Sequence, residues 1–188
     1  MEFIKVVENR RSIRKYKNKD VSNDLITELI NSARLCQSAK NRQTWIFGVL
    51  KGAKKDYIAD LMLNWCDSEN IKEAENAIGY KSSVKNTANI IKEAPVLILV
   101  FRENNDKWIT GDVLSIGAAI EHICLRATDL ELGSLWIRDT VYVQKEICDF
   151  VNHSELELLS TITIGYSNEF PNQRPRKEIK DMIVFYDE

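Results

Sequence analysis

The run Val96-Leu97-Ile98-Leu99-Val100-Phe101, directly after Pro95, is the stretch that decides the fold. All of its side chains are apolar, whereas a strand with one face in water alternates apolar and polar residues. A continuous apolar run of this length is typical of a strand that is covered on both faces. We therefore expect this strand to lie in the centre of the sheet.

The longest helical pattern follows this strand and occupies residues 112–130. Its apolar residues extend almost all round the helix, so a single neighbouring layer cannot bury them all. In a chain of this size, a second copy of the protein is a reasonable source of the missing contacts. We interpret the segment as a buried core helix or a dimer helix, which ends before Gly133.

Shorter patterns predict the remaining elements. Ser22 is suited to cap a helix that runs to about residue 35, and a polar loop over residues 36–44 follows it. Weaker periodicity and more charge over residues 66–84 indicate a surface excursion. The other predicted elements are an amphipathic segment at residues 3–7, strands at 45–50, 134–137 and 158–165, and helices at 54–65, 89–91 and 144–151.

The C-terminal part cannot form an ordinary helix or an internal strand, because it contains Pro171 and Pro175. A final apolar run at residues 182–186 is expected to pair as an edge strand. If it pairs within its own sheet, the arm is local. If it pairs with a partner, the protein is a dimer that exchanges its arms.

The composition indicates one globular domain over residues 1–188. The net charge is −2, so no overall field draws the chain to nucleic acid or to an acidic membrane. We see no long apolar run and no signal-peptide pattern, and we expect a cytoplasmic protein without nucleic-acid or membrane partners. The cysteines stand far apart and are expected to be reduced, and two histidines leave little for a metal site or a catalytic triad.

The stretch Arg10-Arg11-Ser12-Ile13-Arg14 concentrates guanidinium groups near the start of the chain. Arginine presents a planar fork of donors that can hold two phosphate oxygens at once, so the cluster is a candidate anion cradle. The alternative is a solvated basic face, because further lysines follow.

Arg174-Pro175-Arg176 places a second pair of guanidiniums on a stiff backbone near the end of the chain. The glycines of the chain form no Rossmann or P-loop fingerprint, so a nucleotide site of either kind is not expected.

Several separated pieces of the chain together resemble the nitroreductase family of flavin enzymes. They are Arg10-Arg-Ser-Ile-Arg14, Ser38-Ala-Lys-Asn-Arg-Gln-Thr-Trp45, Gly133-Ser-Leu-Trp-Ile137, the pair Gly165-Tyr166, and Arg174-Pro-Arg176. Their order and separation cover nearly the whole chain. The resemblance implies an α+β sandwich with a central, mostly antiparallel sheet flanked by helices. It also implies a homodimer with a long buried central helix, a C-terminal arm, and FMN at the interface.

The resemblance also implies roles for particular residues. Arg10, Ser12, Arg174 and Arg176 would hold the FMN phosphate, and Arg14 would lie toward the pyrimidine side of the ring. The loop from Ser38, by analogy from the opposite subunit, would contact the ring and the ribityl chain. The turn after the third strand would bring a backbone N–H near flavin N5. The expected cofactor-binding residues are Arg10, Arg11, Ser12, Arg14, Ser38, Ala39, Lys40, Asn41, Gln43, Ile137, Arg138, Arg174 and Arg176.

The implied function is NAD(P)H-dependent reduction of nitroaromatics, quinones or a related small acceptor by a ping-pong cycle. Hydride transfer is the cofactor's own chemistry, so no side chain is assigned as catalytic and no metal is expected. A flavin store or sensor without efficient turnover is the alternative. Arg138 and Asp139 depart from the family pattern, in which glycine or an acidic residue is commoner at this turn. We expect Trp136 to be a core residue rather than a flavin-stacking one.

Overall fold

The apolar run after Pro95 forms β2 (Val96–Glu103), and it lies inside the sheet as expected. The computed structural model describes residues 1–68 and 77–186. Its sheet contains β1 (Trp45–Lys51), β2, β4 (Leu156–Gly165) and β3 (Gly133–Ile137), in that spatial order. All three pairings are antiparallel, and Leu99 of β2 lies opposite Gly48 on one side and Thr161 on the other. The predicted α+β class with a central antiparallel sheet is confirmed.

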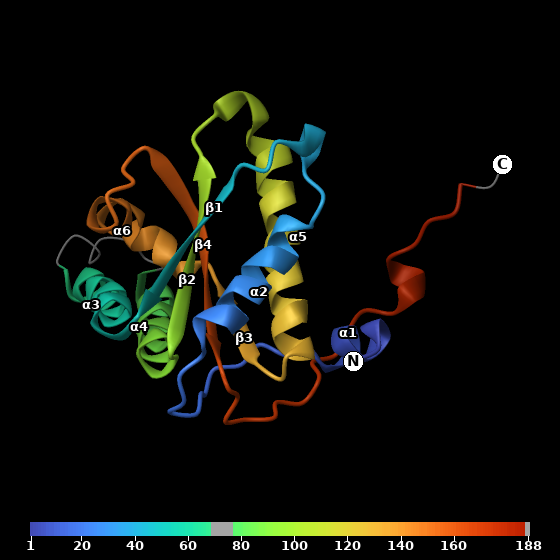
Figure 1. The fold of residues 1–188 in the computed structure, drawn as a ribbon, viewed down its shortest axis with the longest axis horizontal. Coiled ribbons are helices and arrows are strands. Elements are labelled where there is room, and N and C mark those ends of the chain that lie inside the picture. Colours follow the sequence, from blue (N-terminus) through green and yellow to red (C-terminus); the bar gives the residue numbers. More distant parts are fainter. Residues whose placement is uncertain (69–76, 187–188) are drawn as a thin grey trace.

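Helices cover both faces of the sheet (Figure 1). One layer contains α3 (Gly52–Asp67), α4 (Ala77–Glu93) and α6 (Gln144–Phe150), and the other contains α2 (Asn23–Arg34) and α5 (Ile109–Asp129). Leu97 and Leu99 of β2 join the core on the first side, and Ile98 and Val100 join the core on the second. Because successive side chains of a strand point to opposite faces, this double cover explains why the whole run is apolar.

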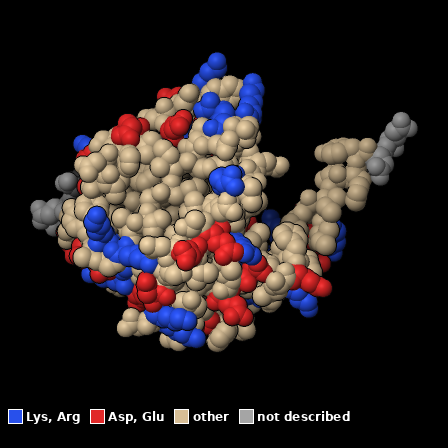
Figure 2. Space-filling model, in the orientation of Figure 1, with Lys and Arg blue, Asp and Glu red and all other residues tan. Residues whose placement is uncertain are grey.

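Several local predictions are confirmed. The Ser22 side chain caps α2 by accepting a hydrogen bond from the Leu25 N–H at 3.3 Å. The first segment forms α1 (Phe3–Asn9). The cysteines Cys36, Cys66, Cys124 and Cys148 are buried and unpaired, and burial raises the pKa of the Cys124 thiol to about 11. On the face shown in Figure 2, acidic and basic side chains are interspersed, which agrees with the small net charge.

α5 is buried on one side only. Ile116, Ile120 and Ile123 pack into the core, whereas Val113 is 41% and Leu114 is 70% exposed. The helical stretch Asp106–Asp129 is long and apolar enough to cross a membrane, with a mean hydropathy of 1.2, and 39% of that window is buried. A core helix of a globular domain has the same length and composition, and α5 packs as one against α2 and the sheet.

The predicted excursion over residues 66–84 is partly wrong. Residues 77–84 form the first turns of α4, and the predicted short helix at 89–91 is the end of the same helix. Residues 69–76, the middle of the predicted excursion, lie outside the described part of the chain. Polar residues hide the period of α4, because its first buried residues in the described part, Val84, Thr87 and Ala88, include a polar and a small one, and its buried isoleucines come only at 90 and 91.

The predicted edge strand at residues 182–186 does not form in this protomer. Beyond residue 176 the chain leaves the body, passes through a short 3-10 helix at Ile179–Asp181, and continues as an extended arm (Figure 1). Its apolar side chains are exposed, including Phe170 at 94% and Phe185 at 77%. The local alternative for the arm is therefore wrong, and the alternative in which a partner covers it stays a prediction.

The segment after α1 is attached to the ends of β3 and β4. The Ile13 N–H donates to the Ser134 carbonyl at 2.9 Å, and the Lys17 N–H donates to the Tyr166 carbonyl at 2.8 Å. The buried Tyr16 hydroxyl is hydrogen-bonded to the Thr163 hydroxyl at 2.8 Å, and burial raises the pKa of Tyr16. Because of this attachment, Pro95 and Tyr16 lie close to the backbone of Gly165.

We expect Gly165→Ala to destabilise the protein by about 1 to 3 kcal/mol, because overpacking forces neighbours to move. A Cβ at this position would lie 2.5 Å from Pro95 Cδ and 2.7 Å from Tyr16 Cδ1. Urea unfolding followed by circular dichroism measures the change. Gly117→Ala is the control, since its nearest neighbour, in Trp136, would be 3.8 Å away. Equal stability of the two variants would contradict the close contact.

Candidate functional site

The two ends of the sequence meet in one pocket of about 110 Å³. From the start of the chain, Arg10, Arg11, Ser12 and Arg14 line it. From the end of the chain, Arg174, Arg176 and the residues at 171–173 line it. Among the residues that the structure describes, five guanidinium-bearing residues and no carboxylate line this pocket, which we call the arginine cradle. Such an arrangement is suited to bind a phosphate group.

Glu169 holds the two ends together beside the arginine cradle. Its carboxylate accepts hydrogen bonds from the Arg14 N–H at 2.5 Å and the Lys15 N–H at 3.3 Å. The Asn168 N–H also donates to the Lys15 carbonyl at 2.9 Å. These contacts hold the extended segment after α1 against the segment that follows β4. The backbone position of Arg14 therefore depends on Asn168 and Glu169.

The guanidinium groups of the cradle keep unused donors. Arg11 donates to the carbonyls of Glu8 at 2.6 Å and Arg10 at 2.9 Å, while its buried Nε has no hydrogen-bond partner. Arg10 Nε lies 3.3 Å from the Glu121 carboxylate of α5. A buried donor without a partner is costly, and an anion with several acceptor oxygens would satisfy it. The residues present therefore fit the phosphate of a cofactor such as FMN.

β3 leads away from the cradle along the free edge of the sheet. Ser12 forms a bridge with Ser134 near the start of this strand. From Ser134 to Arg138 the extended chain takes four steps of about 3.3 Å, which span about 13 Å. Trp136 is 46% exposed, so the prediction that it is a core residue is wrong. It faces α5 on an edge strand, where no further strand covers it.

A second pocket, of about 370 Å³, lies beyond this strand. Trp136, Arg138 and one face of α5 line it. Gly117 of α5 belongs to that face, and Glu121, which pairs with Arg10, lies one helical turn further on. The edge of β3 and this face of α5 therefore connect the arginine cradle with the second pocket.

The predicted loop from Ser38 to Gln43 lies elsewhere, at the start of α5. The Ala39 N–H donates to the Ser115 hydroxyl at 3.0 Å, and the Gln43 N–H donates to the Ser38 hydroxyl at 3.1 Å. Lys40, Asn41 and Gln43 have left-handed backbone conformations, with φ between 49° and 55°. None of these residues lines the cradle pocket. The structure thus brings the predicted arginines together but does not bring this loop to them.

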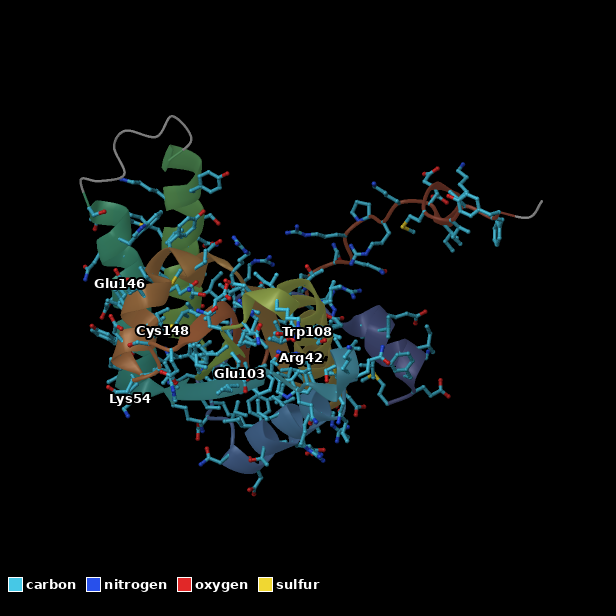
Figure 3. The ribbon with its side chains drawn as sticks, turned by 90° about the horizontal axis from the view of Figure 1, so that it is seen from above. Arg42, Lys54, Glu103, Trp108, Glu146 and Cys148 are labelled. Atoms are coloured by element: carbon cyan, nitrogen blue, oxygen red, sulfur yellow. The ribbon has the colours of Figure 1, made fainter. Side chains whose placement is uncertain are left out.

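Arg42 anchors the loop. Its guanidinium forms two hydrogen bonds to the buried Asp112 carboxylate, at 2.9 and 3.1 Å, which raise the pKa of Arg42. Figure 3 shows Arg42 beside Trp108, and the guanidinium carbon lies 5.3 Å from the centre of that ring.

The sequence did not reveal Asp112, Glu121 or Glu169 as supports of these segments. Glu121 lies in a predicted helix, but its partner Arg10 lies 111 positions earlier in the sequence. Glu169 is 155 positions from Arg14. No local pattern signals an interaction over such distances. The acidic residue at the start of the long helix was the one available signal, because a buried helix with a single charge in its first turn needs a partner for it.

The nitroreductase family model matches residues 7–166. The chain belongs to the nitroreductase family. A protein from Methanothermobacter thermautotrophicus, provisionally named an NADH dehydrogenase/NAD(P)H nitroreductase, is 28% identical over 180 residues, which is 93% of this chain and 82% of the relative. The prediction of a nitroreductase-family oxidoreductase is thereby confirmed.

Solved structures share the whole fold. A BluB-like flavoprotein from Clostridium difficile 630 superposes with a TM-score of 0.88 and 26% identity over 100% of both chains. A nitroreductase with bound FMN from Desulfitobacterium hafniense DCB-2 has a TM-score of 0.80 and 20% identity, over 100% of this chain and 99% of that one. At 20% identity, the similarity to this second protein shows only that the two chains share a fold.

We expect Arg42→Ala to loosen the loop and to lower the melting temperature by several degrees, because it leaves the Asp112 carboxylate buried without its partner. Asp112 is 1% exposed. Differential scanning fluorimetry measures the change. Arg34→Ala is the matched control, since Arg34 is exposed and bonds only to Asn31 in its own helix. A melting temperature that is unchanged in both variants would contradict a structural role for the ion pair.

Proposed function

We propose that this nitroreductase-family protein is an FMN-dependent oxidoreductase that uses NAD(P)H to reduce nitroaromatics, quinones or related small acceptors. The arginine cradle is the single observation that carries the proposal. It joins guanidiniums from both ends of the chain around one pocket, and it contains a buried donor without a partner. A phosphate is the simplest ligand for that arrangement.

The cofactor-binding residues predicted from the sequence would bind different parts of FMN. Arg10, Ser12, Arg174 and Arg176 would bind the phosphate of FMN. Arg14 would place positive charge toward the pyrimidine side of the ring. The flavin would follow the free edge of β3 toward Arg138. The Ser134 carbonyl faces that edge, and by strand alternation the Arg138 N–H does so as well.

When bound, FMN supplies the hydride-transfer chemistry. The chain's own residues bind and orient it, and the second pocket beside the β3 edge offers space for donor and acceptor in turn. In a ping-pong cycle, NAD(P)H would occupy this pocket first and leave it before the acceptor binds there. A positive charge near the pyrimidine favours the reduced, anionic flavin, which is the role of Arg14 in this proposal.

The proposal includes a homodimer with FMN at the interface. Each protomer would contribute the loop from Ser38 to Gln43 to the site of its partner, which its own cradle does not reach. Three exposed apolar surfaces support this: the outer face of α5, α1 with Phe3 at 74%, and the C-terminal arm. Contiguous apolar surface of this kind is typical of interaction sites. Exchange of the arm would cover its apolar run.

The purified protein is expected to bind about one FMN per chain and to oxidise NADH or NADPH with a nitroaromatic or quinone acceptor. Combining Arg10→Ala with Arg174→Ala should weaken FMN binding about 100-fold or more, because each charged hydrogen bond contributes roughly 1.5 to 3 kcal/mol. Flavin fluorescence quenching measures the affinity, and Arg34→Ala is the control. Thermal stability of the cofactor-free variants should change little, because the Arg10–Glu121 pair that is lost is partly exposed and such pairs contribute about 0 to 1 kcal/mol.

Failure of the wild-type protein to bind added FMN would defeat the proposal. FMN binding without NAD(P)H oxidation across an acceptor panel would favour a flavin store or sensor. Loss of thermal stability in the cofactor-free double variant, in proportion to its loss of FMN, would indicate that the arginines are structural.

We expect a dimer in sedimentation equilibrium, and Leu114→Asp on the exposed face of α5 should dissociate it, because a buried charge without a partner is unfavourable. The variant should remain folded, since Leu114 is 70% exposed in the protomer. Tyr80→Asp on α4 is the control, because Tyr80 is exposed on the opposite helical layer. A wild-type monomer at micromolar concentrations would rule out the interface.

A further inference from the structure

The second pocket combines apolar walls with a few polar groups. Val113, Gly117 and Ile120 of α5 and the ring of Trp136 form its apolar walls, while Arg138, Gln144, Ser160 and the Glu157 carboxylate supply polar groups. Its volume of about 370 Å³ is in the range of small-ligand sites. A flat apolar ring with one polar end matches this distribution.

The acids near Arg138 are already engaged. The Asp139 carboxylate accepts hydrogen bonds from the hydroxyls of Ser83 at 3.0 Å and Thr87 at 2.8 Å, both on α4. The Glu157 carboxylate pairs with Arg102, which is 1% exposed. Among residues 1–68 and 77–186, Arg138 has no ion-pair partner. Glu157 also lines the pocket, but its carboxylate is bonded to Arg102, so the guanidinium of Arg138 keeps its donors free for a ligand.

We propose that Arg138 is a specificity-determining residue that selects electron acceptors bearing a carboxylate. The aromatic ring of the acceptor lies in the pocket beside Trp136 and the apolar residues of α5, and its carboxylate accepts two parallel hydrogen bonds from the guanidinium. This bidentate geometry suits a planar anion. The inference rests on the proposed function, because it places the acceptor beside the flavin that the β3 edge would hold.

The backbone and the side chain of Arg138 have separate roles in this arrangement. Its N–H faces the free edge of β3, toward the flavin, whereas its side chain lies on the side of the strand that faces α5, like that of Trp136. A change of side chain therefore alters acceptor recognition while leaving the flavin contact in place. Residue 138 can tune acceptor choice without loss of the cofactor.

The test compares 4-nitrophenylacetate with 4-nitrophenylacetamide in the FMN-loaded enzyme. The methylene group insulates the nitro group from the end group, so the two acceptors are reduced with similar ease and differ in charge. Wild-type kcat/KM should favour the carboxylate, and Arg138→Gln should lower that value about 10- to 100-fold while hardly changing it for the amide. Arg138→Lys should restore part of the preference.

A binding measurement without turnover separates recognition from chemistry. Phenylacetate should perturb the visible absorbance of the oxidised flavoenzyme at about 10-fold lower concentration in the wild type than in Arg138→Gln. Phenylacetamide should show no such difference. Lys145→Gln is the matched control, since Lys145 is an exposed cation next in sequence to Gln144 but does not line this pocket.

Each other result overturns the inference. Equal losses with both acceptors would assign Arg138 to the flavin or the fold. A loss confined to NADPH, with NADH unchanged, would assign it to the phosphate of the donor. A wild-type enzyme that reduces both acceptors equally well would refute the selection of carboxylate acceptors but leave the proposed function standing. A wild-type protein without flavin binding or NAD(P)H oxidation would refute the proposed function together with this inference.

Discussion

Burial of β2 on both faces is the constraint on which the rest of the structure depends. Its seven residues from Val96 to Arg102 are all buried, and the two sets of alternating side chains enter two different cores. Such a strand is stable only between two helical layers, so the chain must supply helices to both sides. With β2 inside, β3 becomes an outer strand, and the candidate site is built along its free edge.

The edge of β3 explains how a chain without a glycine-rich loop can offer a cofactor site. The segment after α1 covers the start of this edge through Ser12 and Ile13, and Tyr16 locks it against β4. Glu169 then ties the segment that carries the first arginines to the chain that leads to the last ones. The arginine cradle is thus held by the backbone of the sheet rather than by a local turn.

Charge is distributed along this edge in an ordered way. At one end, five arginines gather around a small pocket, and Glu121 of α5 balances one of them. At the other end, Arg138 has no ion-pair partner among residues 1–68 and 77–186, because the Asp139 carboxylate is bonded to α4 and the Glu157 carboxylate, which lines the same pocket, is bonded to Arg102. A phosphate at one end and a carboxylate acceptor at the other are the ligands that this distribution favours. The flavin ring would span the region between them.

Local patterns in the sequence determined the central strand, the cap of α2, the long helix and the two arginine clusters, because each depends on neighbours within a few residues. They did not determine the length of α4, whose buried positions include the polar Thr87 and the small Ala88, or the path of residues 182–186, which pair with no strand in the described part of the sheet. The exposure of Trp136 followed from the strand order. Only the tertiary structure decided that Arg10 and Arg174 share a pocket and that the loop from Ser38 to Gln43 does not reach it. These contacts join residues far apart in the chain, and no local periodicity records them.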